Sequence, residues 1–195
     1  MSALSSTGRL SPILSLQAAL RARIGWLCHL IRIAAVVWAL WILAIIAWYW
    51  SDSAAIVKGF GDFLKMDLSG VSNVQYALAV AGKLGSWALQ AAVSYCIWRQ
   101  FGTYLQGRIF TIDAAMWMRR VGIAGLAALL FSLVWRHLII VILAFHVHLP
   151  ARTFLSGPWA GPFDLLQALF CLAVIGFAKI YDAAADMADD HARIV

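Results

Sequence analysis

Charged side chains inside apolar stretches are the residues of this sequence best suited to do chemistry. Lys83, Arg136 and Asp164 each interrupt an apolar run, and His137 directly follows Arg136. Because removing a charge from water is costly unless it is paired or reaches the headgroups, each is a functional candidate. Helical rise, counted from the basic residues at the other end of each run, puts the three charges at a similar depth, about 22–24 Å away. The sequence therefore predicts an outer polar cluster of Lys83, Arg136, His137 and Asp164.

Three uses of this outer polar cluster remain open from sequence. Lys83 and Arg136 can each extend separately to the outer lipid headgroups. Alternatively, Asp164 bridges the two cations in a structural ion pair, or the cluster lines a ligand pocket. Only the second and third uses require these side chains to meet in space.

The sequence predicts no cofactor, no metal and no enzymatic activity. Haem would need two axial ligands facing each other at one depth, and His137 has no histidine partner at its level on another apolar run. His146 and His148 offer only two metal ligands. Nucleotide-binding loops, nucleophile elbows and zinc-protease motifs are missing from the sequence. The cysteines stand singly in apolar runs and are interpreted as buried hydrophobic residues: Cys28, Cys96 and Cys171.

Membrane helices must position these residues. Of the 195 residues, 64% are hydrophobic and only 12% are charged, which is about half the usual charged share. A soluble domain of this size could not bury so much apolar surface, so the expected fold is an all-α polytopic membrane protein. Four transmembrane helices are predicted, at about 33–51, 74–98, 121–145 and 165–179. Whether residues 138–149 stay helical or fold back is left open.

The basic residues predict the direction of the spans. Arginines precede the first span and recur in the connection between spans two and three. The segment 52–72 carries nearly balanced charge. Because basic loops mark the cytoplasmic side, both termini are expected in the cytoplasm. Tryptophans near the span ends are predicted membrane anchors: Trp48 and Trp50 outside, Trp98 and Trp117 inside.

Two segments outside the spans are predicted to form cytoplasmic helices. Residues 1–31 have apolar positions at helical spacing and are expected to form an amphipathic N-terminal helix that lies on the membrane surface. Residues 182–195 are expected to form an acidic helix. Its carboxylates are the predicted partner contact: Asp182, Asp186, Asp189 and Asp190.

The connection between spans two and three contains a helix-start pattern. Thr111 can cap the following helix, Asp113 lies near its positive end, and Phe110 can pack the turn against the helices. This stretch, 107–113 with 118–122, resembles a signature of a bacterial four-helix membrane family, domain of unknown function 2975. The C-terminal residues 182–195 resemble the acidic helix that closes that family's sequences.

The resemblance implies a bacterial inner-membrane protein with four membrane helices. Membrane proteins of such families are often encoded beside a small helix-turn-helix regulator, which implies a membrane-held partner for a transcription factor. The first functional hypothesis is therefore a sensor or anchor that recruits such a regulator through the acidic helix and does not itself bind nucleic acid. The alternative for that helix is that it docks on the chain's own arginines, which are Arg99, Arg108, Arg119 and Arg120.

Two further hypotheses come from other classes of protein. One is an accessory subunit of a respiratory or photosynthetic membrane complex, held through a mid-membrane face at Trp38 and Trp41. The other is a small-molecule or lipid-binding transporter that uses the outer polar cluster. The expected partners are the lipid bilayer and another protein, and the sequence leaves homo-oligomerisation open.

Overall fold

A computed structural model describes residues 7–107, 111–145, 147 and 160–194, with the backbone alone for 7–24, 185 and 188–194. The described chain is all-helical and contains five helices. Their bounds are α1 Thr7–Tyr49, α2 Ser53–Leu64, α3 Asn73–Leu105, α4 Ile112–Leu143 and α6 Pro162–Ile194.

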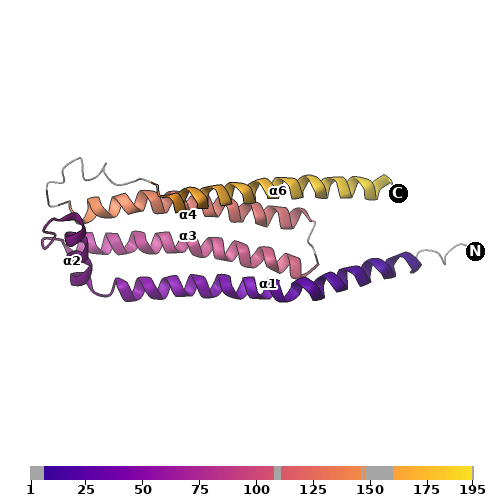
Figure 1. Ribbon diagram of the computed structural model, residues 1–195, viewed down its shortest axis with the longest axis horizontal. Coiled ribbons are helices and arrows are strands. Elements are labelled where there is room, and N and C mark those ends of the chain that lie inside the picture. Colours follow the sequence, from indigo (N-terminus) through magenta and orange to yellow (C-terminus); the bar gives the residue numbers. More distant parts are fainter. Residues whose placement is uncertain (1–6, 108–110, 146, 148–159, 195) are drawn as a thin grey trace, which may run out of the picture.

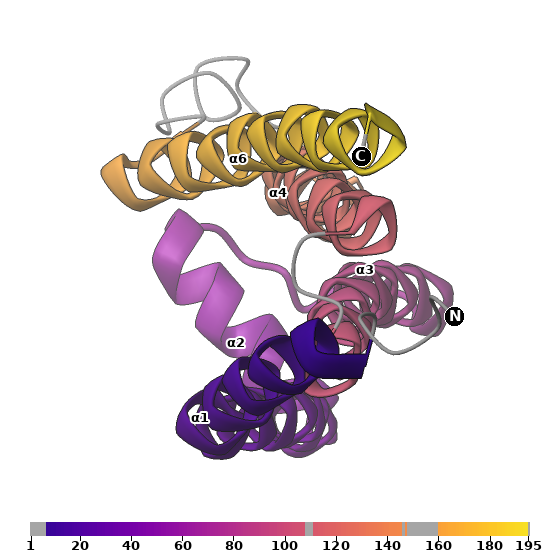
Figure 2. The same ribbon diagram turned by 90° about the vertical axis from the view of Figure 1, so that its right-hand side faces the viewer.

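Four long helices run alternately up and down along one axis. The described ends of α1 and α6 lie at one end of the molecule, and the short α2 crosses the opposite end (Figure 1). We call these the termini end and the α2 end. Viewed along the axis, the long helices form a curved row in the order α1, α3, α4, α6 (Figure 2). α3 packs against both α1 and α4, and α6 packs against α4.

Three helices of the described chain are long and apolar enough to cross a membrane. The qualifying segments are Gly25–Tyr49 of α1, Ile112–Leu143 of α4 and Pro162–Ala184 of α6. By length and apolar character, three of the four predicted spans are thus confirmed, and the one at 74–98 is not. α3 does form there, but polar residues such as Gln75, Lys83 and Gln90 lower its apolar character.

The polar side chains of α3 bond to its two neighbours. The Trp87 indole N–H donates to the Ala39 carbonyl in α1 at 2.9 Å. The Gln75 amide donates to the Ile142 carbonyl in α4 at 3.0 Å. Near the α2 end, the Tyr76 hydroxyl donates to the Trp50 carbonyl at 2.5 Å. These groups therefore join three helices instead of facing solvent.

α1 and α6 each continue across a boundary that the sequence predicted between a membrane span and a cytoplasmic helix. The expected boundaries at 31/32 and 181/182 are not breaks, because α1 runs from Thr7 to Tyr49 and α6 runs from Pro162 to Ile194. No proline interrupts α1 after Pro12 or α6 after Pro162, so nothing in the backbone forces a turn. The segments 1–31 and 182–195 are thus not separate elements where they are described.

The prediction that Trp50 is a membrane anchor is wrong. This residue was expected to be a membrane anchor beside Trp48, but it is buried in a cluster with Ile46 and Ile56, and its ring centroid lies 5.8 Å from that of Tyr76. Trp48 is exposed, and its role as a membrane anchor stays a prediction. The reason is that α2 folds back over the end of α1 and covers Trp50.

Side-chain caps define where α2 and α4 begin. Asp52 Oδ1 accepts from the Ala55 N–H at 3.0 Å, and Thr111 Oγ1 accepts from the Ala114 N–H at 3.4 Å. The Thr111 cap is thus present, with Asp113 in the first turn, whereas Phe110 lies outside the described residues. α4 ends at Leu143, so the helix does not extend through 149.

Glycines allow α4 to approach α6 closely. A methyl group on Gly122 would overlap Ile175 Cγ1 and lie 2.9 Å from the Cys171 carbonyl oxygen. A methyl group on Gly125 would lie 2.6 Å from Cys171 Sγ. Both glycines are therefore close-contact positions between α4 and α6, and small residues of this kind are typical of contacts between apolar helices.

Gly122→Ala is expected to lower the free energy of unfolding in detergent by about 1–3 kcal/mol, because the added methyl group forces α4 and α6 apart. Gly176→Ala on α6 is the matched control, since nothing lies within 4 Å of its added methyl group. The control is expected to be neutral, or more stable by up to about 1 kcal/mol. Equal losses in the two variants would contradict the close-contact role.

Candidate functional site

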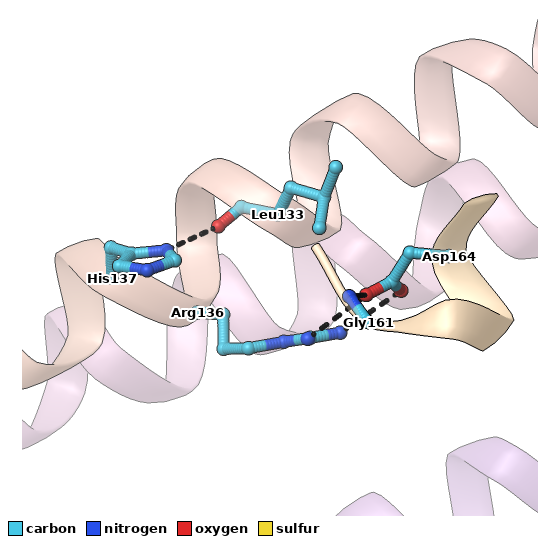
Figure 3. Close-up of polar contacts among 5 residues, drawn as sticks. All are labelled: Leu133, Arg136, His137, Gly161 and Asp164. Atoms are coloured by element: carbon cyan, nitrogen blue, oxygen red, sulfur yellow. Dashed lines mark hydrogen bonds and ion pairs between the residues drawn. The ribbon is translucent and has the colours of Figure 1, made fainter. Parts of the chain in front are cut away.

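An ion pair joins α4 to α6 near the α2 end. Arg136 Nη1 lies 3.2 Å from Asp164 Oδ2, and Nη2 lies 3.3 Å from Oδ1, so the guanidinium and carboxylate meet through two parallel bonds (Figure 3). The Gly161 N–H also donates to Asp164 Oδ2 at 2.8 Å. The Arg136 side chain is 50% exposed and that of Asp164 is 14% exposed. Paired bonds of this kind fix the orientation of the guanidinium.

Lys83 does not join this pair. Its side chain is exposed on α3, and among the described residues it forms no hydrogen bond or ion pair. Asp164 therefore does not bridge the two cations. The predicted cluster is split into a neutral Arg136–Asp164 pair and a separate ammonium group.

His137 is directed away from the ion pair. Its buried ring places Nδ1 2.9 Å from the Leu133 carbonyl oxygen of its own helix (Figure 3). Since a carbonyl can only accept, Nδ1 carries the proton. Within the described ranges no three histidine, cysteine or acidic side chains are grouped to hold a metal. His146 and His148 lie outside those ranges.

Lys83 and Arg136 line one cavity, which we call the α2-end cavity. It has a volume of about 480 Å³ and lies among α1, α2, α3 and α4. Its described lining contains no carboxylate. Aromatic and small polar residues make up much of the wall: Tyr49, Trp50, Phe60, Phe63, Trp135, Ser86 and Ser132.

A second cavity, the mid-helix cavity, lies closer to the termini end and shares α1, α3 and α4 with the first. Its volume is about 370 Å³, and residues from α1, α3, α4 and α6 line it. Ser132 lines both cavities. Gly125, Leu129, Ser132 and Arg136 follow one another at spacings of three and four, so they share one face of α4.

At the termini end, arginines stack on tryptophans. The Arg32 guanidinium carbon lies 4.1 Å from the centroid of Trp98. Those of Arg99 and Arg120 lie 5.1 and 4.6 Å from the centroid of Trp117. Such cation–π contacts orient these arginines and cover both predicted anchor residues at this end.

Tyr104 lies beyond the predicted span in the last turn of α3. Burial raises the pKa of its hydroxyl, and a hydrogen bond from Gln100 Nε2 at 3.0 Å offsets this only in part. The side chain is therefore a neutral packing group at the termini end.

The predicted partner-contact residues lie on the last turns of α6. The side chains of Asp182 and Asp186 are exposed, and neither forms an ion pair with a described arginine. Asp189 and Asp190 belong to the same helix, with their side chains outside the described residues. Where side chains are described, the acidic helix thus does not dock on Arg99, Arg119 or Arg120.

Sequence reasoning missed several lining residues. Ser86, Ser132 and Trp135 contribute to the α2-end cavity, but none of them was singled out. Serines inside apolar helices are a usable signal, because they mark helix contacts or cavities more often than lipid-facing positions. Trp135 has no comparable signal, since its site is created by Gly82, whose missing side chain leaves room for the indole.

Comparison of the chain with protein-family models, with curated proteins and with solved structures found no match in any of the three. Function is therefore inferred from the residues and contacts described above.

A double-mutant cycle is expected to show coupling between Arg136 and Asp164. Arg136→Gln and Asp164→Asn should give an interaction energy of about 1 kcal/mol in the free energy of unfolding, measured in detergent micelles. The control cycle pairs Lys83→Gln with Asp164→Asn, which should be additive within about 0.5 kcal/mol. A control cycle with equal coupling would contradict the separation of Lys83 from the pair.

Proposed function

We propose that this chain is a non-enzymatic membrane protein that recruits a basic cytoplasmic protein through the acidic end of α6. The observation that carries the proposal is the pair of exposed carboxylates on Asp182 and Asp186, which form no ion pair with any described residue. In this proposal the chain lies in a bacterial inner membrane and has four crossings.

The arrangement of the long helices supports α3 as the fourth crossing. Three crossings would put the two ends of the chain on opposite sides of the membrane, yet α1 and α6 have their outer ends at the same end of the molecule (Figure 1). α3 has 33 residues, more than the roughly 20 that a crossing requires. Its hydrogen bonds to α1 and α4 also lower the cost of holding polar side chains in lipid.

Charge distribution supports a cytoplasmic location for the termini end. Arg99, Arg119 and Arg120 lie there, whereas the α2 end has Lys58 and Lys65 balanced by nearby aspartates. Lys and Arg concentrate in cytoplasmic segments. The acidic end of α6 then faces the cytoplasm.

Labelling of single cysteines tests this topology. In a chain whose three native cysteines are replaced by serine, Lys58→Cys is expected to react with a membrane-impermeant maleimide applied to intact cells. Met187→Cys should react only after the cells are opened. Both native side chains are exposed, so access is decided by the membrane. Labelling of both variants from outside would contradict the fourth crossing.

A helix-turn-helix regulator fits the chemistry of the acidic end. DNA-binding proteins of this kind carry basic surfaces, and opposite charges across an interface guide association and specificity. A regulator held by its DNA-binding surface could not bind DNA at the same time. The resemblance to domain of unknown function 2975 motivates the same partner, and the chain itself needs no contact with nucleic acid.

Neutralising the acidic end is expected to release the partner. Asp182→Asn with Asp186→Asn should lower recovery of a small basic protein with the tagged, gently solubilised chain by about tenfold, corresponding to about 1.4 kcal/mol. Screening predicts that rising salt also reduces recovery from the native chain. Mass spectrometry of the purified sample identifies what is bound.

The matched control keeps the charge. Asp182→Glu with Asp186→Glu should retain the partner, because only the carboxylate position changes. A partner retained equally by the Asn and Glu variants would rule out this contact.

A role as an accessory subunit has a separate observation in its favour. Trp38 and Trp41 in α1 are 58% and 61% exposed, within an uncovered apolar face. In a larger membrane complex this face would contact another subunit. Recovery of membrane subunits that survives removal of residues 182–195 would favour this role over recruitment of a regulator.

A further inference from the structure

Lys83 and Arg136 give the α2-end cavity an uneven charge. Asp164 already neutralises Arg136 and holds its guanidinium in place. Lys83 has no carboxylate partner among the described residues. The cavity therefore has one uncompensated positive charge beside an oriented guanidinium, and an anion is the complementary occupant.

The two cavities together have the shape that an amphiphile requires. They lie along one face of α4 and share Ser132. From Arg136 to Gly122, fourteen residues of helix span about 21 Å. One leaflet of the hydrocarbon is about 15 Å thick, so a lipid chain that begins at Arg136 would extend along most of this face. The part of the chain nearest the α2 end would be flanked by Tyr49, Phe60 and Phe63.

We propose that the two cavities hold one anionic phospholipid of the leaflet at the α2 end. The phosphate lies against Lys83 and Arg136, and one acyl chain follows α4 past Ser132 into the mid-helix cavity. The charge of Lys83 selects an anionic over a zwitterionic headgroup. Asp164 fixes the orientation in which the Arg136 guanidinium donates to the phosphate, and the Arg136–Asp164 pair adds no net charge.

Native mass spectrometry of the full chain in detergent tests the proposal. The chain is titrated with equal amounts of phosphatidylglycerol and phosphatidylcholine that carry the same acyl chains. One phosphatidylglycerol is expected to stay bound, and Lys83→Gln should weaken its binding about fivefold, as expected for loss of one basic residue near a lipid phosphate. Lys83 is exposed, so this variant should keep its thermal midpoint, which is measured alongside.

Lys58→Gln is the matched control. It removes an exposed lysine at the same end, on a residue that does not line either cavity named here, and binding should not change. Dihexanoyl phosphatidylglycerol, which has the same headgroup on short chains, should bind at least tenfold more weakly than the long-chain lipid.

Each of four results would overturn the proposal. The first is equal retention of the two headgroups by the native chain, and the second is equal weakening of binding by Lys58→Gln and Lys83→Gln. The third is equal binding of the short-chain and long-chain lipids. The fourth is a lipid-free dimer in which a second copy of the chain covers the two cavities. The third result would leave a site for the headgroup anion alone. None of them bears on the acidic end of α6, so this proposal and the proposed function can fail separately.

Discussion

Hydrogen bonding of the polar side chains of α3 is the constraint on which the arrangement of helices depends. A polar group that packs among apolar helices costs free energy unless it bonds within the protein. Trp87 bonds to a carbonyl of α1, Tyr76 bonds to the Trp50 carbonyl just after α1, and Gln75 bonds to a carbonyl of α4. Because these bonds point in two directions, α3 must lie between α1 and α4. α6 is then left to pack on the far side of α4, where the glycine contacts and the Arg136–Asp164 pair hold it.

The result is an open row of helices instead of a closed bundle. α1 and α6 lie at the two ends of the row (Figure 2). Both helices have many exposed apolar side chains. In a membrane, lipid or another protein covers such side chains without cost. The concave part of the row encloses both cavities, and α2 closes it only at one end. A closed four-helix bundle would have filled this space with side chains from facing helices.

Charge is arranged differently at the two ends of the molecule. At the termini end, Arg99 and Arg120 stack on Trp117, while Asp182 and Asp186 stay exposed. At the α2 end, Asp164 neutralises Arg136 and Lys83 remains unpaired among the described residues. Thus, among the described side chains, the end with more arginine presents unpaired carboxylates, and the end with balanced loops presents an unpaired ammonium group. α6 takes part in both ends, since Asp164 lies in its first turn and the exposed acids lie near its last.

Sequence alone determined the all-helical fold, three of the four predicted spans, the Thr111 cap and the shared level of Arg136 and Asp164, because hydropathy, capping and helical rise act within one segment. It did not determine which of these charges meet. The depth of a residue along a helix follows from the number of residues and the helical rise. A contact also requires the two helices to be neighbours and the side chains to face each other. α6 neighbours α4 and not α3, so Asp164 reaches Arg136 and not Lys83. The burial of Trp50 was likewise decided by tertiary structure, because only the folded α2 covers it.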